Sequence, residues 1–253
     1  MKLLTLARDL KRRKARDRQH LFVSEGVRAV EELLRSPLSI RGALTAPQLM
    51  DAPRGARLSQ ALNDRGVSVE SVEGKDFGSA AETDSPQGVI AIAEIPTRSF
   101  ADVPENWSGV LLVLDGLQDP GNVGTIVRAA AALGAAGTVA LPGTVDLWNA
   151  KVVRSGMGSH FSHLAFTGTW ADVDSFRETS KAPVWVADSS GAAIAPSDTP
   201  RRVILVVGNE GAGLSAEAKA RADRSVSIPI SANVESLNVA VATGILLHEL
   251  RAR

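Results

Sequence analysis

The second half of the chain alternates short, almost wholly apolar runs with stretches that suit helices or loops. The apolar runs lie at residues 110–117, 137–142, 162–168, 183–189, 203–210 and 225–230. A strand that is apolar at nearly every position is buried on both faces, which is typical of a parallel sheet covered by helices on each side. In such sheets ligands bind beyond the carboxyl ends of the strands, so the loops that follow the strands are where chemistry is expected.

Composition excludes several classes of protein. A chain of 253 residues, 44% of them hydrophobic, can bury a substantial core and is long enough for two modest domains. It contains no cysteine, which excludes disulfides, thiolate metal sites and cysteine nucleophiles. No apolar run approaches the ~20 residues that cross a bilayer, and the charges near the amino terminus follow the apolar stretch, the reverse of a secretory signal. We therefore expect a soluble, cytoplasmic protein without a membrane anchor.

The first part of the chain predicts a smaller α/β module. Helical spacing of apolar residues occurs at 3–10 and 27–34, and strand-like runs occur at 21–26, 40–46, 67–72 and 88–95. The proline-containing stretch that follows has no sustained period, which favours a linker. We predict domains at 1–98 and 109–253, joined by a linker at 99–108.

A basic cluster begins the chain. Residues 1–18 carry eight Lys or Arg and two Asp, in the run RDLKRRKARDR. Such a cluster suits nucleic-acid phosphates, but a solvated helix face is an equally good interpretation.

The loop at 114–134, LDGLQDPGNVGTIVRAAAALG, places glycines and a cation at the start of a helix. Asn122 is the expected N-cap, and a buried stripe begins at Val123. Arg128 lies off that stripe, where glycines, a helix N-terminus and a guanidinium together suit an anion such as phosphate. An ordinary surface arginine is the alternative interpretation. The glycine spacing is not G-x-G-x-x-G, which argues against a dinucleotide-binding fingerprint.

Two further loops follow apolar runs. VVGNEGAGLS, at 206–215, offers an unobstructed glycine backbone with Glu210 in the turn. The segment 227–250 introduces a helix through a polar group that includes Ser236 and Asn238, and its small residues suit close packing or a dimer interface. The loop 206–215 alone is also compatible with a plain glycine turn that carries a solvated glutamate.

Other candidates are weaker. His160 and His163 form an H-x-x-H pattern without a third ligand, so buried or surface histidines are favoured over zinc. Trp148 and Trp185 suit either base stacking or a hydrophobic core. Basic residues at 149–161 suit either RNA contact or a plain helix face.

Taken together, the three loops resemble the SPOUT superfamily of S-adenosylmethionine-dependent RNA methyltransferases, in its SpoU or TrmH branch, which modifies ribose 2′-hydroxyls. The matching positions of the family's three motifs are Asn122, Gly124 and Arg128; Gly208, Asn209, Glu210 and Gly211; and Ile228, Pro229, Ser236, Leu237, Asn238, Val239 and Ala240. The resemblance covers about 108–253. The stretch at 25–34 is similar to the RNA-binding fold of ribosomal protein L30e.

The resemblance implies an α/β fold whose parallel-sheet domain ends in a trefoil knot, a smaller L30e-like domain before it, and work as a homodimer. It implies S-adenosylmethionine as cofactor and no metal. The cofactor would bind at Gly208, Gly211, Ile228, Pro229 and Leu237. The catalytic set would be Arg128, Asn122, Glu210, Ser236 and Asn238. The expected RNA contacts are Lys11, Arg12, Arg13, Arg28 and Arg154.

Three hypotheses about function follow. The favoured one is a methyltransferase acting on RNA, with ribosomal RNA preferred to transfer RNA. A nicotinamide-dependent oxidoreductase and a non-catalytic RNA-binding protein of the same fold are the alternatives. Because a guanidinium group keeps its positive charge in proteins, binding phosphate and stabilising alkoxide charge suit Arg128 better than accepting a proton.

Overall fold

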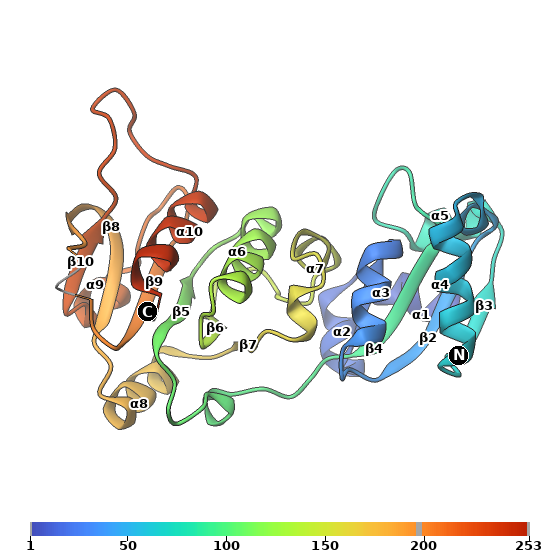
Figure 1. Cartoon of the computed structure of the whole chain (residues 1–253), viewed down its shortest axis with the longest axis horizontal. Coiled ribbons are helices and arrows are strands. Elements are labelled where there is room, and N and C mark those ends of the chain that lie inside the picture. Colours follow the sequence, from blue (N-terminus) through green and yellow to red (C-terminus); the bar gives the residue numbers. More distant parts are fainter. Residues whose placement is uncertain (1, 196–198, 252–253) are drawn as a thin grey trace. The chain divides into compact units, whose positions relative to one another are not determined.

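The computed structural model describes residues 2–195 and 199–251, which form two compact units (Figure 1). The first unit holds the chain up to Thr97 together with Trp148–Ser162. The second holds Arg98–Leu147 and the chain from His163 onward. Among the described residues, no helix is both long enough and apolar enough to cross a membrane.

The first unit is a four-stranded sheet with helices packed on it. Its strand order is β1-β4-β2-β3, in which β1 and β2 pair antiparallel with β4, and β3 pairs parallel with β2. The strands are β1 (Leu21–Glu25), β2 (Ile40–Thr45), β3 (Val69–Ser71) and β4 (Val89–Glu94), and the helices are α1 (Leu3–Asp9), α2 (Arg13–Gln19), α3 (Val27–Arg35), α4 (Pro53–Asp64) and α5 (Gly74–Ala80), with a 3₁₀ helix at Pro47–Asp51.

An insert from later in the chain completes this unit. Residues 148–162 contain α7 (Ala150–Ser155) and a 3₁₀ helix (Ser159–Phe161). The ring of Phe22 on β1 lies 4.5 Å from the ring of Trp148 and 5.8 Å from that of Phe161, measured between centroids. Aromatic pairs at these distances add packing energy beyond simple burial. A segment that the sequence assigns to the second domain therefore belongs to the core of the first unit.

The second unit has a six-stranded sheet of order β10-β8-β9-β5-β6-β7, and every pairing in it is parallel. The predicted parallel-sheet α/β fold is confirmed, although residues 228–230 lie outside the last strand. The strands are β5 (Gly109–Asp115), β6 (Gly137–Ala140), β7 (Ala165–Thr167), β8 (Val184–Ala193), β9 (Arg202–Gly208) and β10 (Arg224–Ser227), and the helices are α6 (Pro120–Ala132), α8 (Trp170–Ser180), α9 (Ala216–Arg221) and α10 (Val239–Leu250).

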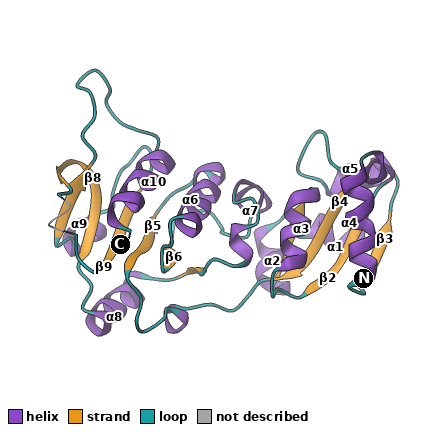
Figure 2. Ribbon diagram, in the orientation of Figure 1, coloured by secondary structure: helices purple, strands orange, loops and turns teal. Residues whose placement is uncertain are grey.

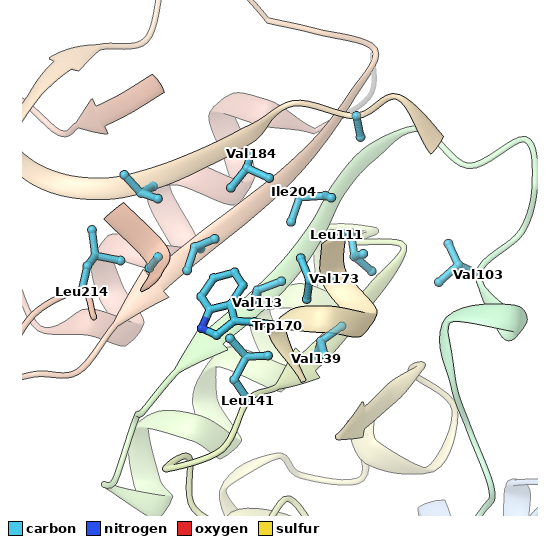
Figure 3. Packing of buried hydrophobic residues seen from close by; sticks show 14 of the residues in the cluster. Val103, Leu111, Val113, Val139, Leu141, Trp170, Val173, Val184, Ile204 and Leu214 are labelled. Carbon is cyan, nitrogen blue, oxygen red and sulfur yellow. The ribbon is translucent and has the colours of Figure 1, made fainter. Parts of the chain in front are cut away.

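Each face of this sheet has its own cover. Side chains from α8, α9 and alternate strand positions form one buried cluster around Trp170, as Figure 3 shows. Strand residues point alternately to opposite faces, so Leu112 and Leu114 of β5 face the other side. There α6 and α10 lie side by side (Figure 2). The trefoil knot that the resemblance implies stays a prediction.

The segment before β5 is ordered. Ser99 and Asp102 form a capping box on the 3₁₀ helix Phe100–Asp102, and Val103 and Trp107 are buried in the same cluster as Trp170. The residues that the sequence assigns to a linker thus pack against the second unit.

One buried histidine makes the second unit sensitive to acid. His163 is 7% exposed, its Nε2 lies 2.9 Å from the Thr138 hydroxyl, and its carbonyl accepts a hydrogen bond from Arg98. Burial, reinforced by the charge of Arg98, lowers the pKa of His163 from 6.5 to about 4. The folded protein therefore keeps this imidazole neutral at pH values where the unfolded chain takes up a proton.

We expect His163→Gln to flatten the pH dependence of stability. The unfolded state binds a proton on His163 more readily than the folded state does. The contribution of neutral His163 to the free energy of unfolding is therefore complete above pH 6.5 and is lost as the pH falls from 6.5 toward 4. Between pH 7 and 4.5 the free energy of unfolding of the wild type should fall by about 2 kcal/mol more than that of the variant. Urea unfolding across this range measures the difference, with the exposed His20→Asn as control. Parallel curves for wild type and His163→Gln would contradict the assignment.

Candidate functional site

The start of α6 differs from the expectation that Asn122 is its N-cap. Asp119 is the N-cap instead: its carboxylate accepts the backbone N–H of Asn122 at 2.8 Å, and Pro120 occupies the first helical position. Proline suits that position because its missing N–H has no partner there. Asn122 therefore lies inside the first turn, and its side chain is available for contacts outside the helix.

The loop after β9 is folded around Asn209. Its side-chain oxygen accepts the N–H groups of Gly211 and Ala212, both at 2.9 Å, and its amide donates to the carbonyl of Gly116, which follows β5. A Cβ on Gly208 would lie 2.6 Å from the backbone of Gly213, so only glycine permits this close approach. Asn209 thus ties together the exits of two neighbouring strands.

The start of α10 is capped by Asn238. Its side-chain oxygen accepts the N–H groups of Ala240 at 2.9 Å and Val241 at 3.3 Å. Asparagine is among the best N-cap residues because it satisfies N–H groups that lack a partner within the helix. The loop before it, residues 229–236, is exposed.

Three side chains from these three loops form one hydrogen-bonded chain. Asn238 Nδ2 donates to Asn122 Oδ1 at 3.0 Å, and Asn122 Nδ2 donates to Glu210 Oε1 at 3.0 Å. The direction is fixed at one end, because the oxygen of Asn238 is held by the N–H groups of α10 and its nitrogen must face Asn122. At the other end, a carboxylate can only accept. We call this the Asn238–Asn122–Glu210 chain.

A cavity of about 600 Å³ opens beside this chain. Its wall combines backbone from the β9 loop with residues of the segment before α10. The lining residues are Asn122, Ala187, Asp188, Ser189, Val207, Gly208, Asn209, Glu210, Gly211, Gly213, Leu214, Val226, Ser227, Ile228, Ile230, Glu235, Ser236, Leu237, Asn238, Val239, Ala242, Thr243 and Leu246.

Most of the predicted site residues meet here. Asn122, Glu210, Ser236 and Asn238 line the cavity, and so do the expected cofactor contacts Gly208, Gly211, Ile228 and Leu237. Pro229 does not line it. Arg128 does not line it either: it is exposed on α6, and no hydrogen bond or ion pair is found for it within the described part of the chain.

The charge of the lining was not predicted from the sequence. Its ionisable side chains are Asp188, Glu210 and Glu235, and no Lys, Arg or His of the described ranges joins them. Asp188 comes from β8, and its pKa is lowered because the side chain and backbone of Ser190 both donate hydrogen bonds to it. Asp188 could have been found from the sequence, because it is an acidic residue at the carboxyl end of a predicted strand.

The expected RNA contacts lie in the first unit. Arg12 and Arg13 are exposed on a surface with Asp9 and Asp17, their respective ion-pair partners. Lys11 donates to the carbonyl of Ala81. Many charges of the basic run are thus engaged within the protein; exposed pairs of this kind are weak and can exchange partners. The remaining two, on α3 and α7, are Arg28, which is exposed, and Arg154, which is half-buried.

The two histidines of the H-x-x-H pattern are buried and belong to different units. Among the described residues no group of three or more His, Asp or Glu side chains is placed to hold a metal ion. Trp148 and Trp185 are buried as well, which fits the core interpretation of both.

The direction of the Asn238–Asn122–Glu210 chain predicts a coupling between its two ends. Asn238→Asp keeps the helix cap but faces Asn122 with a second acceptor, so Asn122 would have to flip and oppose Glu210. Glu210→Gln restores a donor at that end and permits the reversed chain. In urea unfolding, the double variant should therefore be more stable than the sum of the single changes predicts, by about 1 kcal/mol. Additive effects would contradict the assigned direction.

Comparison with known proteins identifies the lineage. Residues 109–248 match the SpoU rRNA Methylase family, and residues 5–91 match the MRM3-like substrate binding domain. The first match covers the sheet, the cavity and the hydrogen-bonded chain. The second covers most of the first unit.

Individual relatives agree with these matches. The chain is 32% identical over 241 residues to the 23S rRNA (guanosine(2553)-2′-O)-methyltransferase RlmP of Bacillus subtilis, covering 94% of this chain and 92% of that protein. It is 36% identical over 200 residues to the 23S rRNA (adenosine(1067)-2′-O)-methyltransferase of Streptomyces laurentii, covering 78% and 73%. The SpoU methyltransferase AviRb of Streptomyces viridochromogenes, solved in complex with AdoMet, superposes with a TM-score of 0.86 at 27% identity, covering 99% and 97%. The chain belongs to the SpoU rRNA methylase family.

Proposed function

We propose that this protein transfers a methyl group from S-adenosylmethionine to a ribose 2′-hydroxyl of RNA. The observation that carries the proposal is the Asn238–Asn122–Glu210 chain, which draws three loops around a single cavity. Relatives named as 2′-O-methyltransferases and an AdoMet-bound neighbour support it.

The cavity suits this cofactor in size and charge. About 600 Å³ is within the range of small-molecule sites. The backbone of Gly208 and Gly211 and the side chains of Ile228 and Leu237 would hold the adenosine part. The three lining carboxylates favour a ligand with net positive charge, as S-adenosylmethionine has. The diphosphate of a nicotinamide dinucleotide would meet the same carboxylates, and no Lys, Arg or His of the described ranges lines the cavity to balance it, which disfavours the oxidoreductase alternative.

The protein's main task in this reaction is positioning. When bound, the cofactor supplies a methyl group activated by its sulfonium. Holding an acceptor hydroxyl in line with such a group can supply roughly 7–11 kcal/mol of barrier lowering. We assign Asn122, Glu210, Ser236 and Asn238 to fixing the loops and the ribose. Arg128 would bind the adjacent phosphate and stabilise negative charge on the reacting oxygen.

A homodimer would complete the site. Arg128 lies outside the lining of the cavity in its own chain, so the guanidinium that meets the ribose would come from the second copy. The predicted suitability of α10 for a dimer interface supports this, because an apolar residue of the helix faces outward: Val241 is 53% exposed. Ile230 and Val234, in the neighbouring loop, are 38% and 48% exposed.

We propose ribosomal RNA, in preference to transfer RNA, as the substrate. The match of the first unit to a substrate binding domain and the 23S rRNA substrates in the relatives' names support this choice. The RNA contacts would be the basic residues Lys11, Arg12, Arg13, Arg28 and Arg154. The protein would act in the cytoplasm.

Arg128→Ala should abolish methyl transfer while leaving RNA affinity within about threefold of the wild type, because one phosphate contact among many is lost. Arg128→Lys, which keeps the charge but not the bidentate geometry, should retain only partial activity. Transfer of labelled methyl groups to total RNA and filter binding measure the two quantities. Full activity of Arg128→Ala would refute the role of Arg128, and RNA binding without transfer by the wild type would favour the non-catalytic alternative.

Mixing two inactive variants tests the shared site. If Arg128 acts on the cavity of the second copy, Arg128→Ala and Asn238→Ala chains should form mixed dimers with one intact site of two. Activity should then return to about a quarter of the wild-type value after equilibration, since half of the dimers are mixed. No recovery, with mixed dimers demonstrated by native mass spectrometry, would place Arg128 at the cavity of its own chain.

A further inference from the structure

One lining residue of the cavity has an environment that the shared motifs do not explain. Asp188 follows the buried part of β8, which pairs with β9 through Val186 and Val206. On its other side, β8 pairs with β10, but the register jumps: Val186 pairs with Ser225, and Ala192 pairs with Val226. Residues 187–191 therefore form a bulge. Such bulges redirect side chains and are frequent next to active sites.

The bulge is held in place by close packing. A Cβ on Gly191 would lie 2.6 Å from the carbonyl carbon of Ser225, so the backbone there approaches β10 as closely as glycine permits. The Ser227 hydroxyl donates to the Gly191 carbonyl at 2.7 Å. The bulge is thus a fixed feature that presents Asp188 and Ser189 to the cavity.

The carboxylate of Asp188 is itself oriented. One of its oxygens, Oδ1, accepts both the hydroxyl of Ser190 at 2.6 Å and its N–H at 2.9 Å. Little conformational freedom remains to be lost when a ligand binds. The other two lining carboxylates differ: Glu210 is exposed and accepts from Asn122, and Glu235 lies on the exposed loop before α10. Asp188 is the half-buried one of the three.

We propose that Asp188 makes the cavity select the cationic cofactor over the product, which lacks the sulfonium charge. The inference rests on the proposed function. S-adenosylmethionine carries a sulfonium, and loss of its methyl group leaves a neutral thioether in S-adenosylhomocysteine. A fixed carboxylate on the wall favours the first ligand and gains nothing comparable from the second. Methyl transfer thereby lowers the affinity of the cavity for the bound molecule, which promotes replacement of S-adenosylhomocysteine by S-adenosylmethionine.

Calorimetric titration of the full chain with three probes tests this. The probes are S-adenosylmethionine, S-adenosylhomocysteine and sinefungin, in which a carbon bearing a protonated amine replaces the sulfonium. Asp188→Asn keeps the hydrogen bonds from Ser190 and removes the charge. We expect this variant to lower the affinity for S-adenosylmethionine and sinefungin by about tenfold and the affinity for S-adenosylhomocysteine by less than about twofold. A tenfold change in affinity is ~1.4 kcal/mol.

Two further variants serve as controls for the titration. Glu178→Gln removes one carboxylate from an exposed position of α8 outside the cavity and should leave the ratio of affinities unchanged. Ser190→Ala keeps the charge of Asp188 but removes one of the hydrogen bonds that orient its carboxylate. It should lower the ratio of the affinities for S-adenosylmethionine and S-adenosylhomocysteine by a smaller factor than Asp188→Asn does. Thermal melting without ligand verifies that each variant is folded.

The outcomes separate the inference from the proposed function. Equal weakening of all three probes by Asp188→Asn, or no change in any, would overturn the role of Asp188 while leaving the methyltransferase proposal intact. A wild-type chain that binds none of the probes would overturn the methyltransferase proposal and the inference with it.

Discussion

The side chain of Asn238 determines how the three loops of the site meet. Its oxygen is committed to the first N–H groups of α10, so its nitrogen must point away from the helix, toward Asn122. That single commitment orients the amide of Asn122 and directs it to Glu210. The parallel sheet supplies the precondition, because β5 and β9 are neighbours and their carboxyl ends release both loops at one edge. The residue that caps α10 therefore also fixes the hydrogen bonds between the loops that line the cavity.

Charge is divided between two kinds of surface. The cavity is lined by carboxylates and by no described cation, whereas basic side chains lie at exposed positions of helices, Arg128 on α6 and Arg28 on α3 among them. This separation of acidic and basic surfaces suits a reaction that transfers a methyl group from a cationic donor to a polyanionic acceptor. In the proposed reaction each partner would meet a surface of opposite sign.

The sequence predicts the sheet well because strands buried on both faces are apolar throughout. It also places Glu210 after a predicted strand and Asn238 at the start of a predicted helix. That these two residues act together with Asn122 is what the family resemblance implies. It does not predict that residues 148–162 pack on the first unit, because apolar spacing shows that a segment is buried but not against which partner. Asp188 was missed for a related reason: its position depends on a β-bulge, a register change that leaves no periodic signal.

Hydrogen exchange with and without S-adenosylmethionine tests the central claim, that three loops close on one cofactor, most directly. We expect slower exchange in the loop 208–215, in the segment 228–238 and in the first turns of α6 and α10, with the first unit unchanged. Protection confined to one of these segments, or found mainly elsewhere in the second unit, would contradict it.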